Sequence, residues 1–364
     1  MNTTIGILSM QKVVNYGSFL QAFALKKAIE SLGSDVYFLD INQGEYLPGL
    51  EIRKNRRLKS FISSLYSGKL QANQRRKQYF SELSTQFREN YFKILELSKD
   101  SPSFFDGVII GSDEVFHACQ QSPWGFSTQL FGRGLPSKHI ISYAASFGNT
   151  TVESILNYGI ENTITESLKN LDSISVRDSN SYEIIRYLTE YRPSIHVDPV
   201  MFYDFSDYMG EIDTKDYILI YTYPERITPR EQENITHFAK INNKKLISIG
   251  CSYPWSETVI PDSPFEVLSY FDNADYVITD TFHGTVFSIK YNKNFCTFIR
   301  NTNKHKLLFL LQQFDQENRQ AESEHDLYRI LMNEPDYSKT NELIKSERMR
   351  SIDYLSDFTH TIRV

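Results

Sequence analysis

The sequence contains 364 residues, of which 40% are hydrophobic, and its formal net charge is -6. This length predicts two domains with sizeable cores, and the negative charge argues against a nucleic-acid-binding protein. The three cysteines stand far apart, which argues against a disulfide framework or a zinc site. The N-terminal residues lack a basic region and a long apolar core, and no run of about 18 apolar residues occurs, so we expect a soluble, cytoplasmic protein.

The first 40 residues predict a β-α-β unit. Bulky residues at 5–8 and 36–39 are typical of strands, and the apolar residues between them recur at helical spacing as far as Gly33. The loop at 15–18 therefore lies at the carboxyl end of a strand, where open α/β sheets bind ligands. An ordinary capped turn is the simpler interpretation of this loop. Three polar residues in and after it could instead hydrogen-bond sugar hydroxyls: Asn15, Tyr16 and Gln21.

Residues 51–77 depart from the acidic average of the chain. They contain nine lysines and arginines but a single acidic residue, Glu51. Such a stretch could attract anionic lipid headgroups or a diphosphate-linked glycan. We favour a solvated helical insertion over 51–100, because runs of charge usually face water. The basic residues are Arg53, Lys54, Arg56, Arg57, Lys59, Lys69, Arg75, Arg76 and Lys77.

Two adjacent carboxylates follow the next predicted strand, at 108–110. Carboxylates in such a place are costly unless they are solvated or paired, so they are plausible site groups. Adjacent residues point in different directions, and we favour Asp113 over Glu114.

Two further strands are predicted at 140–143 and 174–176, and the second ends at Arg177. A guanidinium is a permanent cation with a planar fork that suits a carboxylate or a phosphate. A structural ion pair between Arg177 and Asp178 is an equally good interpretation of the same residues.

The second half repeats the alternation of strands and helices after a stretch with little periodic pattern at 201–215. We place the domain boundary there, with domains at 1–200 and 216–335 and a closing helix at 336–364. Neither a G-x-G-x-x-G loop after a strand nor a Walker motif occurs, which disfavours a dinucleotide enzyme. The predicted elements are strands at 217–222, 246–250, 276–279 and 295–299, and helices at 229–242, 264–271, 284–291, 304–314, 324–333 and 339–358.

A histidine stands at the turn after the strand at 276–279. We expect a short helix from Gly284, whose free N–H group, with those of Thr285 and Val286, would favour an anion such as phosphate. His283 would then lie beside this anion. The alternative is a neutral histidine that closes a turn by hydrogen bonding.

Six segments of the sequence carry a family resemblance: ILSMQKVVNYGSFLQAFALKKAIESLG at 7–33, VIIGSDEVF at 108–116, ISYAASFG at 141–148, SVRD at 175–178, VDPV at 197–200 and ITDTFHGTVFSIKYNKNF at 278–295. In this order they resemble the polysaccharide pyruvyl transferase family. Its members with assigned chemistry transfer pyruvate from phosphoenolpyruvate to sugar hydroxyls. The resemblance implies an α/β fold with two Rossmann-like domains in a GT-B-like arrangement, and a C-terminal helix that returns to the first domain.

The resemblance also implies roles for individual residues. His283 would supply the proton that C3 of phosphoenolpyruvate needs, and Asp113 would accept or orient the sugar hydroxyl. The donor would be bound by Arg177, Gly284, Thr285, Lys290 and Arg300. The acceptor, a sugar or lipid-linked glycan for a capsule or exopolysaccharide, would be bound by Asn15, Tyr16, Gln21, Ser112 and Glu114. We expect no metal and no cofactor, with phosphoenolpyruvate as the donor substrate.

Two departures from the family pattern bear on these roles. Glu114, Phe116 and His117 stand where Gln, Trp and Asn are commoner, which affects the expected acceptor contacts. Thr281 stands where some relatives carry a basic residue, so another cation, Arg177 or Arg300, would have to replace it. Nucleotide-sugar glycosyl transfer and a non-catalytic glycan-binding or assembly role are the alternative functions.

Overall fold

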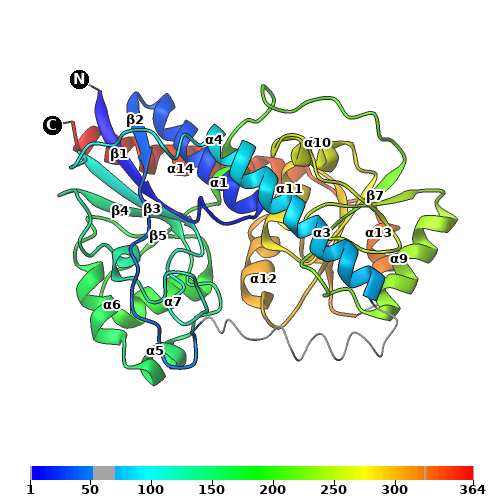
Figure 1. The fold of residues 1–364 in the computed structure, drawn as a ribbon, viewed down its shortest axis with the longest axis horizontal. Coiled ribbons are helices and arrows are strands. Elements are labelled where there is room, and N and C mark those ends of the chain that lie inside the picture. Colours follow the sequence, from blue (N-terminus) through cyan, green and yellow to red (C-terminus); the bar gives the residue numbers. More distant parts are fainter. Residues whose placement is uncertain (1, 52–69, 324, 364) are drawn as a thin grey trace.

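The computed structural model describes residues 2–51, 70–323 and 325–363. Two six-stranded sheets, each with helices packed around it, lie side by side along the long axis of the molecule (Figure 1). In the described residues, all strand pairings within both sheets are parallel. The α/β prediction with two Rossmann-like units is confirmed.

The first sheet has the strand order β2-β1-β3-β4-β5-β6. All residues of its central strand β3 are buried, because helices cover both faces of a parallel sheet. Its strands are β1 (Thr3–Leu8), β2 (Ser34–Phe38), β3 (Gly107–Asp113), β4 (Ile140–Ala145), β5 (Ser175–Val176) and β6 (Ser194–Ile195).

The second sheet has the strand order β12-β11-β10-β7-β8-β9. Every predicted strand of either half is present within about three residues of its expected limits. The two-residue strands β6, β9 and β12 were missed, since so short a run carries no period. Its strands are β7 (Tyr217–Tyr221), β8 (Lys245–Ser248), β9 (Glu257–Thr258), β10 (Tyr276–Thr279), β11 (Asn294–Phe298) and β12 (Gln320–Ala321).

Most of the helices connect the parallel strands, and several begin at a polar N-cap. Asn15 accepts a hydrogen bond from the N–H of Ser18 at the start of the first helix, as a capped turn requires. The helices are α1 (Tyr16–Ser31), α3 (Leu70–Gln86), α4 (Phe92–Ile94), α5 (Val152–Tyr158), α6 (Glu161–Leu168), α7 (Ser179–Leu188), α8 (Pro199–Phe202), α9 (Pro229–Ile241), α10 (Glu266–Asn273), α11 (Phe282–Lys290), α12 (Lys304–Gln313), α13 (Asp326–Leu331) and α14 (Ser338–Thr361).

The C-terminal helix α14 returns to the first sheet, as predicted. The hydroxyl of Tyr354 donates to the carbonyl oxygen of Ser142 in β4 at 2.9 Å. Beyond the helix, Arg363 donates to the carbonyl oxygen of Leu32 at 2.6 Å. The second unit is therefore fastened to the first at its C-terminal end as well as at its N-terminal end. The domain limits at 200, 216 and 335 stay predictions.

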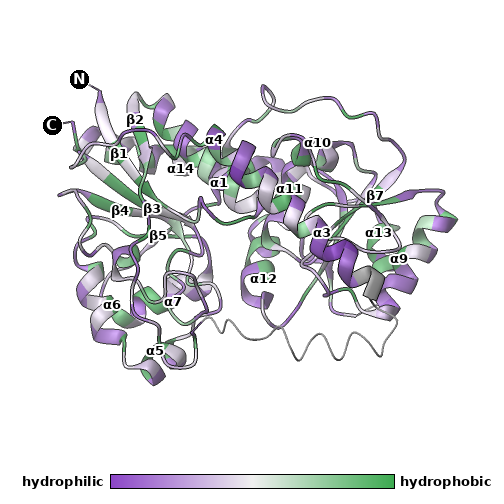
Figure 2. Cartoon of the chain, viewed as in Figure 1, coloured by the Kyte–Doolittle hydropathy of each residue, from purple (hydrophilic) through white to green (hydrophobic). Residues whose placement is uncertain are grey.

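Helix α3 precedes most of the first sheet in the chain but lies over the second one (Figure 1). The hydroxyl of Tyr79 accepts a hydrogen bond from the N–H of Gly250, and Tyr91, in the π-helical turn that follows α3, donates to the carbonyl oxygen of Pro261. Figure 2 shows hydrophobic and hydrophilic residues alternating along this helix. Most of the predicted basic segment, at 52–69, lies outside the described residues, so its partner stays a prediction.

Among the described residues, no helix is both long enough and apolar enough to cross a membrane.

Candidate functional site

Four ionisable side chains meet where the two halves of the chain face each other. They are Asp113 at the end of β3, Arg177 after β5, Asp198 before α8 and His283 in the first turn of α11. The carboxyl ends of parallel strands share one edge of a sheet, which is why residues so far apart in sequence converge. The structure thus brings the predicted Asp113, Arg177 and His283 together and adds Asp198.

Arg177 links the two aspartates. Its Nη1 donates to Oδ2 of Asp198 and its Nη2 donates to Oδ1 of Asp113, both at 3.0 Å. The guanidinium carbon lies 4.2 Å from the centre of the Phe282 ring, and the residue is 4% exposed. Burial by itself would lower the pKa of Arg177, but the two carboxylates outweigh it and raise that pKa. Arg177 is therefore a fixed, buried cation.

The alternative ion pair between Arg177 and Asp178 is wrong. Asp178 is the N-cap of α7, where its Oδ1 accepts from the N–H of Ser181 at 2.8 Å and its Oδ2 accepts from the hydroxyl of Ser146 at 2.6 Å. Adjacent residues point in different directions, so Arg177 reaches the site while its neighbour caps a helix.

Asp113 is buried and fully paired. Its Oδ2 accepts a hydrogen bond from the hydroxyl of Ser18 at 2.7 Å, and its backbone has φ +82°, which non-glycine residues rarely adopt. Burial alone would raise the pKa of Asp113, but Arg177 and then His283 hold it well below its ordinary value. Asp113 is therefore a carboxylate throughout the usual pH range, and a weak base.

His283 is held between two elements of the first half. On one side, Nε2 lies 3.4 Å from Oδ2 of Asp198, whose Oδ1 accepts from the N–H of Val200 and so caps α8. On the other side the ring lies against Gly17 in the first turn of α1, where an added Cβ would lie 2.1 Å from the imidazole Cγ. These contacts fix the orientation of the ring.

A second ion pair joins the two halves beside this cluster. Nζ of Lys306, in the first turn of α12, lies 2.5 Å from Oε1 of Glu114. Burial would raise the pKa of Glu114 and lower that of Lys306, but the pair itself reverses both shifts and keeps both groups charged.

Apart from Asp198, the residues of both clusters line one cavity of ≈ 290 Å³. The first half contributes Asn15, Ser18, Trp124 and His117 to its wall, besides Asp113, Glu114 and Arg177; the second contributes Tyr223, Phe282, His283 and Lys306. Among the described residues, no group of three or more His, Cys, Asp or Glu side chains is placed to hold a metal ion.

The residues predicted to bind the acceptor divide into two groups. Asn15 and Glu114 line the cavity. Tyr16, Gln21 and Ser112 are 2%, 0% and 0% exposed, so they cannot reach a sugar in this structure. Gln21 donates to the hydroxyl of Ser9 and to the carbonyl oxygen of Ser18, which holds the loop beneath the site. Tyr16 and Gln21 belong to α1, which turns their side chains inward, and Ser112 is a buried residue of β3.

The predicted free amides of Gly284 and Thr285 are not free. Helix α11 begins at Phe282, two residues earlier than expected, because Thr281 is its N-cap. The Thr281 hydroxyl accepts the N–H of Gly284 at 2.9 Å, and its carbonyl oxygen accepts the N–H of Thr285 at 3.2 Å. The prediction of an anion site at these amides is therefore wrong.

The structure does not bring Lys290 or Arg300 into the cavity wall. Nζ of Lys290, at the far end of α11, donates to the carbonyl oxygen of Tyr203 at 2.7 Å, and burial lowers its pKa to about 8. Both outer nitrogens of Arg300 are bound by the two carboxylate oxygens of Glu231. Lys290 follows His283 by seven residues, so it lies on the same side of α11 but about 10 Å further along the helix axis, which places it beside Tyr203 and away from the cavity.

The sequence analysis missed Asp198 and Lys306 as site residues. Asp198 belongs to the VDPV segment, so its position directly before a proline at the start of a helix was a usable signal. Lys306 carried no such signal, because its place is set by how α12 meets the first half.

Comparisons with known proteins agree with this architecture. The sequence model of a family described as polysaccharide pyruvyl transferase matches residues 15–302, whereas no curated protein matches the chain. Among solved structures, the chain is similar to UDP-N-acetylglucosamine 2-epimerase from Rickettsia bellii, with 10% identity, a TM-score of 0.51 and 98% of each chain covered. The chain is also similar to UDP-GlcNAc 2-epimerase from Methanocaldococcus jannaschii, with 11% identity and a TM-score of 0.49. That comparison covers 97% of this chain and 100% of that chain.

A mutant O-GlcNAc transferase from Thermobaculum terrenum gives 12% identity and a TM-score of 0.42, with 99% of this chain and 66% of that chain covered, so the chain spans slightly less than two thirds of that protein. At these identities the likeness shows the fold alone, which is GT-B-like.

Proposed function

The chain belongs to the polysaccharide pyruvyl transferase family, and we propose that it transfers the pyruvyl group of phosphoenolpyruvate to two hydroxyls of one sugar, forming a cyclic ketal. The sugar would be part of a cell-surface polysaccharide or of its lipid-linked precursor. The observation that supports this is the convergence of His283, Asp113 and Arg177 on one cavity between the two halves.

The first step is addition of a sugar hydroxyl to C2 of the donor. Asp113, with its lowered pKa, is a poor proton acceptor but a good hydrogen-bond acceptor, so it orients the hydroxyl. His283 receives the hydroxyl proton and delivers it to C3, while Asp198 faces Nε2 and stabilises the ring whenever it is charged. The product is a tetrahedral phospho-ketal.

The second step releases phosphate. The C2–O bond to phosphate breaks, a second hydroxyl of the same sugar attacks C2, and its proton leaves with the phosphate. The net reaction converts phosphoenolpyruvate and two hydroxyls into a ketal and inorganic phosphate. Positioned cations stabilise the departing charge in such steps.

The donor is an anion and needs a cation to bind it, but the cations that line the cavity already have carboxylate partners. Arg177 bonds two carboxylates, whereas Lys306 has Glu114 as its one ion-pair partner among the described residues. Lys306 can therefore exchange a single partner for the donor phosphate, and we assign it that role. Arg177 then holds Asp113 and Asp198 in place rather than binding the donor directly.

Ligand-induced thermal stabilisation tests this proposal. Millimolar phosphoenolpyruvate should raise the melting temperature of the wild type, and Lys306→Ala should lose most of that rise. Release of inorganic phosphate with a glycan acceptor would complete the test. Protection by a nucleotide diphosphate instead would point to glycosyl transfer, and protection by neither to a non-catalytic role.

Contact with an anionic membrane through 51–77 stays a prediction. It is tested by sedimentation with anionic vesicles at low and at physiological salt, because screening weakens such binding over a Debye length of about 8 Å.

A further inference from the structure

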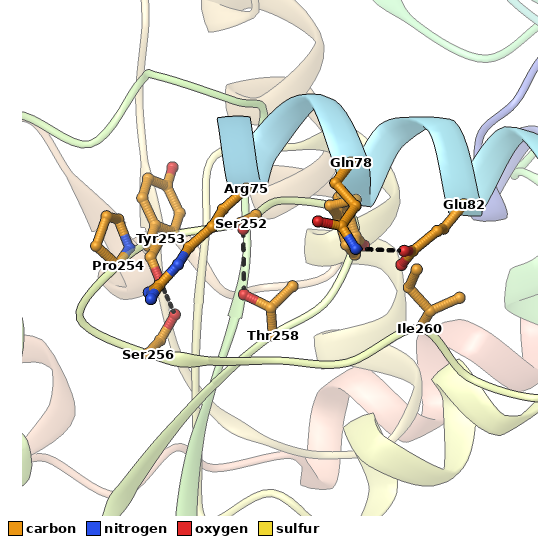
Figure 3. Close-up of a pocket in the computed structure, with 10 residues that line it drawn as sticks. Arg75, Gln78, Glu82, Ser252, Tyr253, Pro254, Ser256, Thr258 and Ile260 are labelled. Atoms are coloured by element: carbon orange, nitrogen blue, oxygen red, sulfur yellow. Dashed lines mark hydrogen bonds between the residues drawn. The ribbon is translucent and has the colours of Figure 1, made fainter. Parts of the chain in front are cut away.

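A second hollow shares no lining residue with the cavity. It has a volume of ≈ 480 Å³ and is formed by one face of α3 and by the segment that follows β8 (Figure 3). We call it the α3 groove. Helix α3 contributes Arg75, Gln78 and Glu82, and the opposite wall contributes Ser252, Ser256 and Thr258.

We infer that the α3 groove binds an oligosaccharide segment of the acceptor, beyond the sugar that is modified. This inference rests on the proposed function, since it extends the acceptor side of the same reaction.

The walls of the groove are held in place without a ligand. Tyr79, 5% exposed, bonds the N–H of Gly250 through its hydroxyl at 2.8 Å. Arg76 forms an ion pair with Glu225. Within the opposite wall, the Thr258 hydroxyl donates a hydrogen bond to the Ser252 hydroxyl at 3.3 Å. A groove that already has its shape loses little entropy when a ligand is bound.

The lining chemistry suits a polyhydroxylated ligand. Gln78 donates to Glu82 at 2.9 Å, so an amide oxygen and carboxylate oxygens point into the groove beside the serine and threonine hydroxyls. Arg75 is exposed and has no hydrogen-bond or ion-pair partner among the described residues, and in Figure 3 its side chain extends toward Pro254 and Ser256. A guanidinium without a partner offers several N–H donors to sugar oxygens.

A residue of the groove wall contacts the segment that contributes Tyr223 to the cavity. Tyr253 lines the groove, and its hydroxyl lies 2.8 Å from that of Thr222, the residue before Tyr223. Tyr223 lines the cavity. The groove and the cavity therefore lie close together, and we infer that a long acceptor can reach both.

The volumes of the cavity and the groove agree with a long acceptor that occupies both. The cavity of ≈ 290 Å³ lies at the lower edge of the roughly 300–1,000 Å³ typical of small-molecule sites. It has room for the donor and about one sugar, so the remainder of a polymeric acceptor must lie outside it. The α3 groove, at ≈ 480 Å³, has room for that remainder.

Binding to an array of bacterial surface oligosaccharides tests the inference, with the full chain as His283→Ala so that no acceptor is consumed. In this background, Arg75→Ala combined with Gln78→Ala should weaken binding at least tenfold for the glycans that the parent protein recognises. Lys77→Ala is the matched control, because Lys77 is an exposed cation of the same helix that does not line the groove. It should bind as the parent does.

Equal binding by the groove variant and its parent would overturn the inference, as would an equal loss in the Lys77 control, which would indicate general charge attraction. Recognition of no oligosaccharide by the parent would also overturn it. This test does not depend on the donor. If the protein bound glycans through the groove but phosphoenolpyruvate gave no thermal protection, the groove inference would stand and the proposed reaction would be rejected.

Discussion

Gly17 and His283 are 266 positions apart, yet no side chain fits between them: a Cβ at Gly17 would lie 2.1 Å from Cγ of the imidazole. Gly17 belongs to the first turn of α1 and His283 to the first turn of α11, so the contact joins the first half of the chain to the second. The geometry of the histidine is therefore set by a backbone that belongs to the other half.

Gly17→Ala should abolish turnover while the protein remains folded. In an unhindered helix this change would stabilise by roughly 0.5–1 kcal/mol, but a contact of 2.1 Å forces the ring to move. Melting temperature and phosphate release measure the two effects. Gly210→Ala is the control, because an added Cβ there meets nothing within 4 Å. Normal turnover in a folded Gly17→Ala protein would show that the ring position is unimportant.

Asp198→Asn should lower kcat and shift its pH profile. Asparagine can keep the cap on α8, but it removes the charge that faces His283 at 3.4 Å. Removing a positioned acid or base costs about 10²–10⁴-fold in rate, so we expect His283→Gln to lose that much and Asp198→Asn to lose less.

Asp178→Asn serves as the control for Asp198→Asn, since Asp178 caps α7 without contacting the histidine. If Asp198→Asn left the pH profile of kcat unchanged, Asp198 would be structural only.

Arg177→Met should destabilise the fold by roughly 3–5 kcal/mol at neutral pH, because it leaves two buried carboxylates without their cation. Urea unfolding measures the change. Arg186→Met, which removes an exposed arginine, should change stability by less than about 1 kcal/mol. A small loss for Arg177→Met would mean that water enters the cluster and solvates the aspartates.

Asp280 should make stability depend on pH between about pH 4 and pH 6. Burial raises its pKa to about 6, and its Oδ2 has no hydrogen-bond partner in the described residues, although Arg226 and Arg300 lie 3.7 and 3.9 Å away. A raised folded-state pKa gives stability that is present below the unfolded value and is lost as pH rises through the folded one.

Two pKa units correspond to about 3 kcal/mol, so stability attributable to Asp280 should fall by that order between pH 4 and pH 7. Asp280→Asn should lack this component, measured as the difference in unfolding free energy from the wild type at each pH. Parallel pH profiles for the two proteins would refute the prediction.

The sequence by itself determined the local elements and the residue types at their ends. Continuous apolar runs such as 108–110 are recognisable because a strand buried on both faces needs them, and Asp113, Arg177 and His283 follow such runs within five residues. These features depend on neighbours within a few positions, which is why the fold class and the core of the cluster could be predicted.

Tertiary structure alone decided which groups became partners. Arg177 could pair with Asp178 or with a more distant carboxylate. The strand order β3-β4-β5-β6 placed Asp113, at the end of β3, and Asp198, after β6, within its reach instead. Tyr16 and Gln21 looked available but α1 turned them into the core. Such outcomes depend on the summed packing of distant segments, because a buried charge must find its counter-ion wherever the folded backbone places one.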